Sequence, residues 1–259
     1  MLPCDIDLPE ALDFARALAM AGGDLSLRHF QTPLDVERKG DGSPVTAADR
    51  EVEAHIRDAI QSAWPGHGII GEESGSRRPD APFTWVVDPI DGTSAFLHGV
   101  PLYGVLIALE YQKTPILGVV NCPAAREIVS AAVGLGCWWN GRRCAVSRTA
   151  ALKDGLVVAS AWHGATVRPG APSCARLMQA GGAFRTWGHC YGFLLVATGR
   201  ADVMIDAGLK HWDTAALIPI LCEAGGTMTD WRGGPVAREG NALATNGLVL
   251  AETLDCLAE

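Results

Sequence analysis

The 259-residue sequence lacks several features that would each point to a class of protein. It has no excess of positive charge: 21 basic and 29 acidic side chains give a net charge of −8. No broad electrostatic attraction to nucleic acid or to an anionic membrane is therefore expected. No uninterrupted apolar stretch approaches the ~20 residues that a membrane-spanning helix needs. The first ten residues, M-L-P-C-D-I-D-L-P-E, hold no basic segment followed by an apolar core, so we expect no secretory signal there.

The cysteines lack a pattern as well. The eight of them form no C-x-x-C pair, which argues against a structural zinc site. Their scattered spacing favours a reducing, cytoplasmic environment over a disulfide framework. Charged residues make up only 19% of the chain and apolar residues 48%, which is typical of a globular protein. At this length we expect one large domain, or two closely joined halves, with a sizeable core.

The first half of the sequence predicts two helices followed by strands. Apolar residues recur at helical spacing over 8–30. Thr46 begins a second helix, because T-A-A-D has the form of a capping box, and a Trp-Pro pair at 64–65 ends it. An Asn-Gly pair at 140–141 predicts a hairpin turn. Short strands are expected at 68–73, 83–88, 103–110 and 115–121.

After about residue 150 strands and helices alternate, which predicts a layered α/β half. Two halves, 1–150 and 151–259, are expected to meet near 148–155. A pair of glycines at 225–226 would end the last of the predicted helices. The strands are expected at 156–161, 183–187, 201–206 and 227–231, and the helices at 172–181, 189–199 and 212–224.

Five acids stand out by their positions. Three of them follow predicted strands, where the ligand sites of layered α/β proteins gather. The other two lie in the first turns of helices, where an acid can serve only to offset the helix dipole. In order along the chain the five are Asp49, Glu72, Asp88, Asp91 and Asp213.

The stretch W-V-V-D-P-I-D-G-T at 85–93 holds two of these acids close together. Asp88 and Asp91 flank a proline turn and would repel each other unless a cation lay between them. Oxygen ligands alone favour Mg²⁺, Mn²⁺ or Ca²⁺ over zinc. Gly92-Thr93 then opens a helix, where backbone N–H groups can approach an anion. Metal ligands beside a phosphate cradle suit metal-assisted phosphoryl transfer to water.

Five blocks of the sequence resemble the inositol monophosphatase family. The resemblance covers nearly the whole chain in order, and Lys39 fits the same pattern. It implies a mixed α/β fold, the five-layered αβαβα sandwich of that family, and a Mg²⁺-dependent phosphomonoesterase. The blocks are V-T-A-A-D-R-E-V-E at 45–53, G-E-E-S at 71–74, W-V-V-D-P-I-D-G-T at 85–93, W-D-T-A-A at 212–216 and A-G-G at 224–226.

The resemblance implies a ligand set for two to three Mg²⁺ ions, which Mn²⁺ could replace. A first ion would be held by Glu72, Asp88 and the carbonyl of Ile90. A second would be held by Asp88, Asp91 and Asp213. A third, weaker ion would bind near Glu72, mostly through water.

Catalytic and phosphate-binding roles are implied in the same way. Thr93 would pair with Asp49 to orient and deprotonate the attacking water. The amides of Gly92 and Thr93 would hold the phosphate, and Lys39 would temper the charge of the carboxylates, Glu73 included. The catalytic residues would then be Asp49, Thr93, Glu72 and Lys39. Inhibition by lithium and assembly as a homodimer are common in the family, and we expect both here.

The second half most resembles the histidinol-phosphate phosphatase branch of the family. L-Histidinol phosphate, an intermediate of histidine biosynthesis, is therefore the first candidate substrate, with no nucleic acid or membrane partner. The substrate contacts would be Asp91, Ser94, His189 and Asp206. The blocks that carry this resemblance are P-L-Y-G-V-L-I-A-L at 101–109, G-H-C-Y-G-F-L-L-V-A-T-G-R at 188–200 and A-G-L-K-H-W-D at 207–213.

Three departures from that branch leave the substrate open. His189 stands where an aspartate is usual, Asp206 replaces a glutamate, and Ser94 stands where a basic residue is frequent. Inositol 1-phosphate or another polyol phosphate is thus an alternative. A regulatory binding protein on the same fold is an alternative of another class.

Several conspicuous residues have simpler interpretations. His189 could have no role beyond capping a helix or filling the core, and His163 suits a surface loop. Trp138-Trp139 would serve packing or an oligomer contact. We expect Arg185 and Arg200 to be solvated charges and Cys190 and Cys222 to be small buried hydrophobes.

Overall fold

The computed structural model describes residues 6–40, 44–160 and 172–258. Its α-helices are α1 (Leu8–His29), α2 (Ala47–Ala63), α3 (Thr93–Leu97), α4 (Pro172–Ala180), α5 (His189–Ala197), α6 (His211–Ala215), α7 (Leu217–Glu223) and α8 (Leu250–Leu257). Short 3₁₀ turns cover Pro123–Ala125 and Leu152–Asp154. Its strands are β1 (Glu37–Arg38), β2 (Pro44–Val45), β3 (Gly68–Gly71), β4 (Gly75–Arg77), β5 (Phe83–Asp91), β6 (Gly104–Tyr111), β7 (Thr114–Cys122), β8 (Glu127–Ala132), β9 (Gly136–Trp139), β10 (Arg142–Arg143), β11 (Leu156–Ala159), β12 (Ala183–Arg185), β13 (Val203–Leu209), β14 (Thr227–Thr229) and β15 (Gly240–Thr245).

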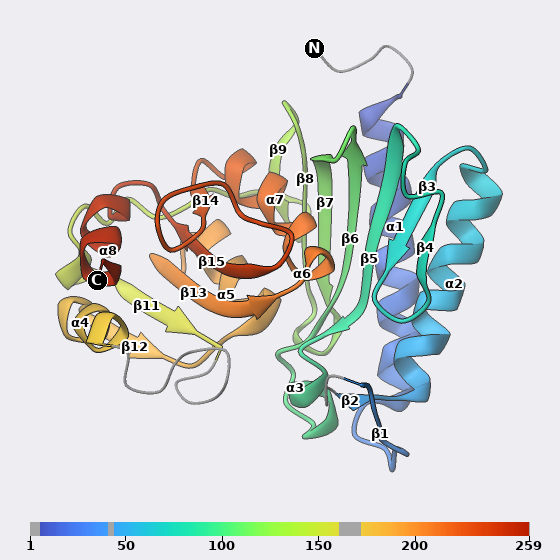
Figure 1. The fold of residues 1–259 in the computed structure, drawn as a ribbon, viewed down its shortest axis with the longest axis horizontal. Coiled ribbons are helices and arrows are strands. Elements are labelled where there is room, and N and C mark those ends of the chain that lie inside the picture. The colour runs from blue at the N-terminus through green and yellow to red at the C-terminus, as the bar shows by residue number, and fades with distance from the viewer. Residues whose placement is uncertain (1–5, 41–43, 161–171, 259) are drawn as a thin grey trace.

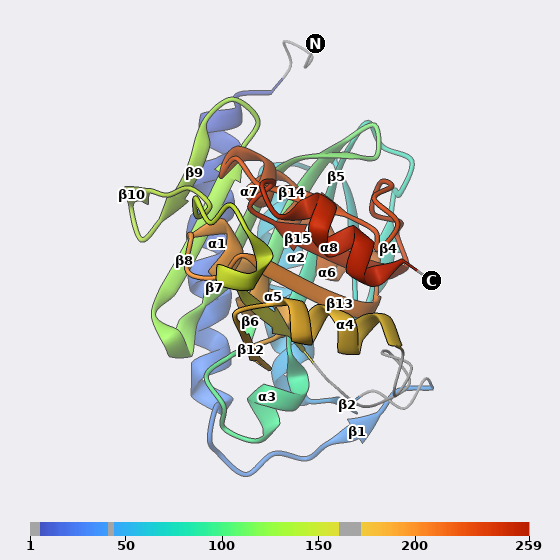
Figure 2. The same cartoon turned by 90° about the vertical axis from the view of Figure 1, so that its left-hand side faces the viewer.

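Five layers of secondary structure stack across the molecule (Figure 1). Helices α1 and α2 cover one face of an eight-stranded sheet with the order β10-β9-β8-β7-β6-β5-β3-β4. Helices α5, α6 and α7 lie between that sheet and a five-stranded sheet with the order β12-β11-β13-β15-β14. Helices α4 and α8 cover the outer face of the second sheet, as Figure 2 shows from the side. This order of layers confirms the αβαβα sandwich that the resemblance implied.

Strand β5 is buried on both faces because helices cover both sides of its sheet. Trp85 and Val87 pack in the core under α1 and α2, and Val86 points to the opposite face, into the core between the two sheets. Successive side chains of a strand point to opposite faces, so a strand between two helical layers needs an unbroken apolar run. The sequence W-V-V supplies that run and leads directly to the acids at the strand's end.

The predicted helices of the first half are confirmed. Helix α1 occupies the predicted range, and Asp7 caps it by accepting a hydrogen bond from the backbone N–H of Glu10. Helix α2 begins with the predicted capping box. The Thr46 side chain accepts from the backbone of the first turn, and the Asp49 side chain accepts from the backbone N–H of Thr46. The alternation of strands and helices after residue 150 is also confirmed.

The single helix predicted over 212–224 is wrong. The structure has two helices there, α6 and α7, which meet at Ala216. Pro219 explains the break, because proline has no N–H to donate to the carbonyl of Ala215 and its ring crowds that carbonyl. At this break the Ala216 carbonyl lies against Gly118 of β7. A Cβ atom at position 118 would lie only 2.0 Å from the Ala216 carbonyl oxygen.

Strand β5 continues beyond its predicted end at Asp88 and reaches Asp91. Its register against β6 shifts between these two residues, so Pro89 and Ile90 form an irregular step in the ladder. Proline cannot donate to a neighbouring strand, which accounts for the interruption. The step keeps both aspartates at one end of the sheet.

The two sheets take their strands from different parts of the chain. The eight-stranded sheet uses residues 68–143 and the five-stranded sheet residues 156–245. One core cluster nevertheless contains residues of both, such as Val120 of β7 and Val158 of β11. The division into 1–150 and 151–259 stays a prediction. Among the described residues no helix is both long and apolar enough to cross a membrane.

Candidate active site

Three acids converge between the two sheets. Asp88 and Asp91 come from the irregular end of β5, and Asp213 comes from the first turn of α6. One carboxylate oxygen of each lies within 4.8 Å of the others. Asp88 is 1% exposed and Asp91 9% exposed, so water screens their charges poorly. The two halves of the chain thus build one acidic cluster.

Backbone hydrogen bonds fix these acids in place. The Asp88 carboxylate accepts from the backbone N–H of Ile90 (3.1 Å), and the Asp213 carboxylate accepts from that of Lys210 (2.7 Å). The Asp91 carboxylate accepts from the backbone N–H of Cys190 at the start of α5 (2.5 Å). Each bond leaves part of a carboxylate free for another partner, because a carboxylate has about four acceptor positions.

Gly92 forms the turn that follows the cluster. Its φ angle is +82°, a conformation in which a side chain is strained. A Cβ atom there would also lie 3.1 Å from the carbonyl oxygen of Leu102 and 3.3 Å from the ring of His189. The turn leads into α3, whose first residue, Thr93, donates its hydroxyl hydrogen to the Ile90 carbonyl (3.1 Å). The backbone is therefore closely approached from two sides, and a side chain at Gly92 would press against both neighbours.

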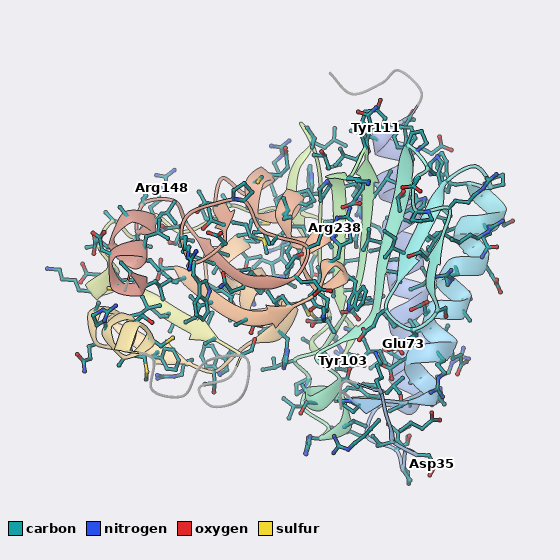
Figure 3. The ribbon with its side chains drawn as sticks, viewed as in Figure 1. Asp35, Glu73, Tyr103, Tyr111, Arg148 and Arg238 are labelled. Carbon is teal, nitrogen blue, oxygen red and sulfur yellow. The ribbon has the colours of Figure 1, made fainter. Side chains whose placement is uncertain are left out.

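Lys39 lies beside two glutamates that follow β3. Its ammonium donates to Glu72 (2.7 Å) and to Glu73 (2.6 Å), and Figure 3 labels Glu73 at this end of the sheet. Burial works against the charge of Lys39, but the hydrogen bonds with the two glutamates raise its pKa. The predicted place of Lys39 next to the acidic site is consistent with these contacts.

Glu53 positions these glutamates, and sequence reasoning assigned it no role. It is fully buried on α2 and accepts from the backbone N–H groups of Glu73 (2.7 Å) and Ser74 (2.9 Å). Gly71 makes room for it, since a Cβ atom there would lie 2.4 Å from a Glu53 oxygen. The available signal was its spacing: Glu53 is four residues after Asp49 and hence on the same face of the helix.

Asp49 and Thr93 each have other partners than the resemblance implied. One oxygen of Asp49 accepts from the backbone N–H (2.8 Å) and the hydroxyl (2.7 Å) of Thr46. Thr93 donates to Ile90. Asp49 therefore caps its helix, and its second oxygen is the one available to a ligand. The hydrogen bonds described for these two side chains do not join them directly.

The electrostatics of the cluster oppose its ionisation. Burial, and then the charges of Glu72, Asp91 and Asp213, raise the pKa of Asp88 well above its usual range. Burial and the charge of Asp91 raise the pKa of Asp213 to about 8. Burial also raises the pKa of Glu72, and raises that of Glu73 to about 7. A site that buries mutually repelling carboxylates favours a ligand with concentrated positive charge.

A hard divalent cation fits this donor set. The atoms that converge are carboxylate oxygens, with no histidine nitrogen or thiolate among the three grouped residues. Oxygen-only donors suit Mg²⁺, Mn²⁺ or Ca²⁺, while zinc and copper prefer nitrogen and sulfur. The raised pKa values are the expected property of such a site without its cation.

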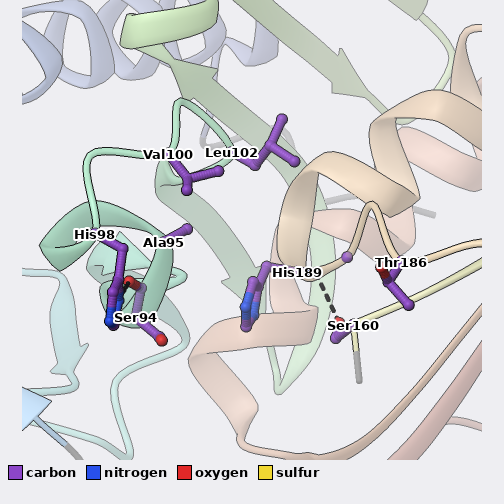
Figure 4. Close-up of a pocket in the computed structure, with 9 residues that line it drawn as sticks. Ser94, Ala95, His98, Val100, Leu102, Ser160, Thr186 and His189 are labelled. Carbon is purple, nitrogen blue, oxygen red and sulfur yellow. Dashed lines mark hydrogen bonds between the residues drawn. The ribbon is translucent and has the colours of Figure 1, made fainter. Parts of the chain in front are cut away.

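A cavity of about 250 Å³ opens next to the Gly92 turn (Figure 4). Polar side chains face it from two sides, and the aliphatic side chains of Val100 and Leu102 lie between them. Both halves of the chain contribute to it. The lining residues are Ser94, Ala95, His98, Val100, Leu102, Ser160, Thr186, Gly188 and His189.

His189 links this cavity to the acidic cluster. Its φ angle is +55°, which is uncommon for a residue with a side chain. The backbone N–H of His189 donates to the hydroxyl of Ser160 (2.7 Å), the bond drawn in Figure 4. Strained residues of this kind gather at functional sites. His189 therefore lines the cavity and does not simply fill the core.

Asp206 lies behind the cavity and is not among its lining residues. It is 6% exposed, and burial raises its pKa to about 6. One of its oxygens accepts from the hydroxyl of Ser160 and the other from the backbone N–H of Ala207 (2.9 Å). Among the predicted substrate contacts, Ser94 and His189 thus face the cavity, and Asp206 reaches it through Ser160.

Two further expectations are wrong. Arg200 is not a solvated charge: its guanidinium pairs with Glu127 through two bonds (2.9 and 2.5 Å) and lies 4.3 Å from the ring centre of Trp139. Cys222 is exposed, whereas Cys190 is buried as expected. Trp139 serves packing, as predicted. His163 lies outside the described residues.

The comparisons with known proteins define the class of this protein. The model of the inositol monophosphatase family matches residues 7–259, so the chain belongs to the inositol monophosphatase family. Members of this family are phosphatases that depend on divalent metal ions. The protein is accordingly a phosphoric monoester hydrolase, and the alternative of a non-catalytic binding protein finds no support.

Individual relatives carry two kinds of name. The chain is 40% identical over 244 residues to a histidinol-phosphatase of Chlorobaculum parvum, covering 94% of both chains. It is 35% identical over 258 residues to an inositol-1-monophosphatase of Synechocystis, covering 97% of this chain and 90% of that protein. Among solved structures, the inositol monophosphatase of Anabaena has a TM-score of 0.85 at 29% identity, covering 97% and 96% of the two chains.

Proposed function

We propose that this phosphatase hydrolyses L-histidinol phosphate to L-histidinol and phosphate. The observation that carries the proposal is the mixed lining of the cavity beside the Gly92 turn. Val100 and Leu102 supply aliphatic surface, and polar groups flank it on both sides. Ser94 and His98 come from the α3 side, and His189 lies opposite them. A flat imidazole ring with polar edges suits such a cavity, because its faces need apolar contacts and its nitrogens need partners. The 40% identity to a protein named histidinol-phosphatase supports the same choice.

Two or three Mg²⁺ ions are proposed to bind at the acidic cluster. Glu72, Asp88, Asp91, Asp213 and the Ile90 carbonyl would hold them. The ions would supply Lewis acidity toward the phosphate and lower the pKa of water.

Groups of the protein itself would bind the phosphate, accept the proton and contact the rest of the substrate. The backbone amides of Gly92 and Thr93 would hold the phosphate, and the free oxygen of Asp49 would accept a proton from the attacking water. Lys39 would keep Glu72 ionised through their hydrogen bond. Ser94 and His189 would contact the part of the substrate beyond the phosphate, and Asp206 would hold Ser160 against His189. A homodimer is proposed only because members of the family commonly form one.

Inositol 1-phosphate is the second candidate, and a specific observation favours it. Asp206 is 6% exposed and is not among the residues that line the cavity, so this carboxylate is poorly placed to receive a substrate ammonium. Hydroxyl groups of a polyol could instead bond to Ser94, Ser160 and His189, which both donate and accept. The relatives named inositol-1-monophosphatase are in keeping with this candidate.

A direct comparison of kcat/KM for the two esters, on one Mg²⁺-loaded preparation, tests the choice. We expect the larger value for L-histidinol phosphate. A preference for inositol 1-phosphate of more than tenfold, or about 1.4 kcal/mol in the transition state, would overturn the proposal.

A pair of matched variants tests the aliphatic surface at Val100. Val100→Thr places a hydroxyl in the cavity and should lower kcat/KM for L-histidinol phosphate more than for inositol 1-phosphate. Val133→Thr makes the same change at an exposed valine that is not a lining residue of the cavity, and it should leave both values unchanged.

A further inference from the structure

Two cysteines lie side by side at the open end of the β9–β10 hairpin. Cys137 is on β9, and Cys144 directly follows β10. Their sulfur atoms are 3.3 Å apart, and the backbone N–H of Cys144 donates to the Cys137 carbonyl (3.0 Å). Both residues are free thiols, and neither has a part in the proposed phosphatase site.

The hairpin register places the two residues directly opposite each other. Trp139 pairs with Arg142 and Trp138 with Arg143, so the next pair along the ladder is Cys137 with Cys144. Opposed residues of a hydrogen-bonded antiparallel pair have Cα atoms about 5.5 Å apart. This separation is close to the commonest value for disulfides, and an S–S bond is about 2.05 Å long. Rotation of the side chains can therefore close the gap without a change of the backbone.

The turn of the hairpin holds this register. Asn140 and Gly141 have φ angles of +48° and +77°, as a tight two-residue turn requires. The Asn140 side chain also accepts from the backbone N–H of Ile128 (2.8 Å) and donates to the carbonyl of Arg126 (3.1 Å). The two sulfurs are therefore presented to each other by a fixed backbone.

The two thiols differ in access and in acidity. Cys144 is half-buried, whereas Cys137 is 1% exposed. The hydrogen bond with Cys137 and the positive charge of Arg200 lower the pKa of Cys144. The hydrogen bond with Cys144 and burial raise the pKa of Cys137. Since the thiolate is the attacking form, Cys144 is the group that a reagent from solution meets first.

We propose that Cys137 and Cys144 form a reversible intrachain disulfide by exchange with a small-molecule disulfide. The Cys144 thiolate attacks one sulfur of the reagent, forms a mixed disulfide and releases one thiolate. The Cys137 thiol then loses its proton to solvent and attacks the Cys144 sulfur, which releases the second thiolate. Two protein thiols are oxidised and one small disulfide is reduced to two thiols, so electrons and atoms balance.

A second close pair shows why this hairpin is selected. The sulfurs of Cys122 and Cys190 are 4.0 Å apart, but these residues are 0% and 2% exposed and come from β7 and α5. A reagent in solution cannot reach either sulfur without an opening of the core between the sheets. The proposal is therefore specific for the hairpin.

The sequence makes the test direct. The reduced protein is incubated with oxidised glutathione, then denatured, alkylated and digested with trypsin without reduction. Trypsin cuts after Arg126, Arg142, Arg143 and Arg148, which puts Cys137 in peptide 127–142 and Cys144 in peptide 144–148. We expect these two peptides joined, an intact-protein mass lower by about two hydrogen atoms, and full reversal by dithiothreitol.

Two variants complete the test. Cys144→Ser should abolish the linked peptides, and Cys222→Ser, at the exposed cysteine of α7, should leave them unchanged. The oxidised wild-type protein should also unfold a few degrees higher than its reduced form, because a crosslink restricts the unfolded chain. The proposal is overturned if wild-type protein yields no linked peptides, if a glutathione adduct persists on Cys144, or if Cys144→Ser still loses the two hydrogens. These outcomes are independent of phosphatase activity and hence of the proposed substrate.

Discussion

Replacing Asp213 with asparagine tests whether the acidic cluster is electrostatically strained without its cation. The folded, metal-free chain holds a proton on Asp213 up to a pKa of about 8, whereas an aspartate of the unfolded chain loses it near 3.9. Between pH 5 and pH 8 the folded state thus binds about one proton more than the unfolded state. This contribution to stability is present at low pH and is lost as the pH rises toward 8. At the higher pH the folded state must either hold a proton that the unfolded state has released or carry the negative charge of Asp213 beside the other acids.

The magnitude follows from that proton. Stability falls by about 1.4 kcal/mol for each pH unit over which the difference persists, so this one group removes about 4 kcal/mol between pH 5 and pH 8. This is a large share of the roughly 5–15 kcal/mol that holds a typical domain folded. Asparagine cannot ionise, and its side-chain oxygen can still accept the hydrogen bond from the backbone N–H of Lys210.

Urea unfolding in EDTA at several pH values measures the effect. Wild-type protein should lose stability steeply toward pH 8, and Asp213→Asn should lose much less and become the more stable of the two there. Mg²⁺ should restore wild-type stability at pH 8 and have a smaller effect on the variant. Asp58→Asn, at an exposed position of α2, should behave as wild type. Parallel pH profiles for Asp213→Asn and wild type would refute the account of mutual repulsion.

Three further predictions concern single groups. Asp91→Asn should lower phosphate release with Mg²⁺ by more than about a hundredfold, beyond the usual cost of losing a group that only supports a metal ligand; turnover near the wild-type rate would contradict the ligand assignment. Gly92→Ala and Gly75→Ala both place a side chain at positive φ, with a cost of about 1–2 kcal/mol each in urea unfolding. Only Gly92→Ala should raise KM, since space around Gly75 is open; equal KM values would count against the phosphate cradle. Glu110→Gln should destabilise the fold by about 1–3 kcal/mol in urea, because it removes a buried carboxylate that faces Arg238 at 3.2 Å and the His211 ring at 3.0 Å; a loss below about 0.5 kcal/mol would show that these contacts do not stabilise the fold.

The Glu110 contact is one of several that could not be predicted from the sequence. Glu110 lies on β6, and one of its carboxylate oxygens lies 3.0 Å from Nε2 of His211 at the start of α6, in a contact that is not aligned as a hydrogen bond. Arg238, labelled in Figure 3, donates to its other oxygen (3.2 Å). The partners are about a hundred residues or more apart in the chain. Periodicity reports only the neighbours within an element, so pairs across the two halves leave no local signal.

Local signals did predict the elements that position the acids. The capping box of α2, the apolar run of β5 and the glycine turn at Gly92 all depend on residues within about ten positions of one another. The break between α6 and α7 also has a local cause, Pro219, whereas the helical spacing on both sides of it favours one continuous helix. The pairing of Arg200 with Glu127 had no such local sign, because these residues are 73 positions apart.

The same distinction explains why the chemistry is easier to infer than the substrate. Asp88 and Asp91 are fixed by one irregular strand end, and any change among the acids disturbs a balance of several buried charges. Asp206, by contrast, reaches the cavity only through Ser160, and His189, which lines the cavity, donates its backbone N–H to the same hydroxyl. We expect a replacement on this side to alter what the cavity accepts and to leave the acidic cluster intact. The departures at Ser94, His189 and Asp206 all fall on this more tolerant side, so specificity can change within this fold while the hydrolytic reaction is retained.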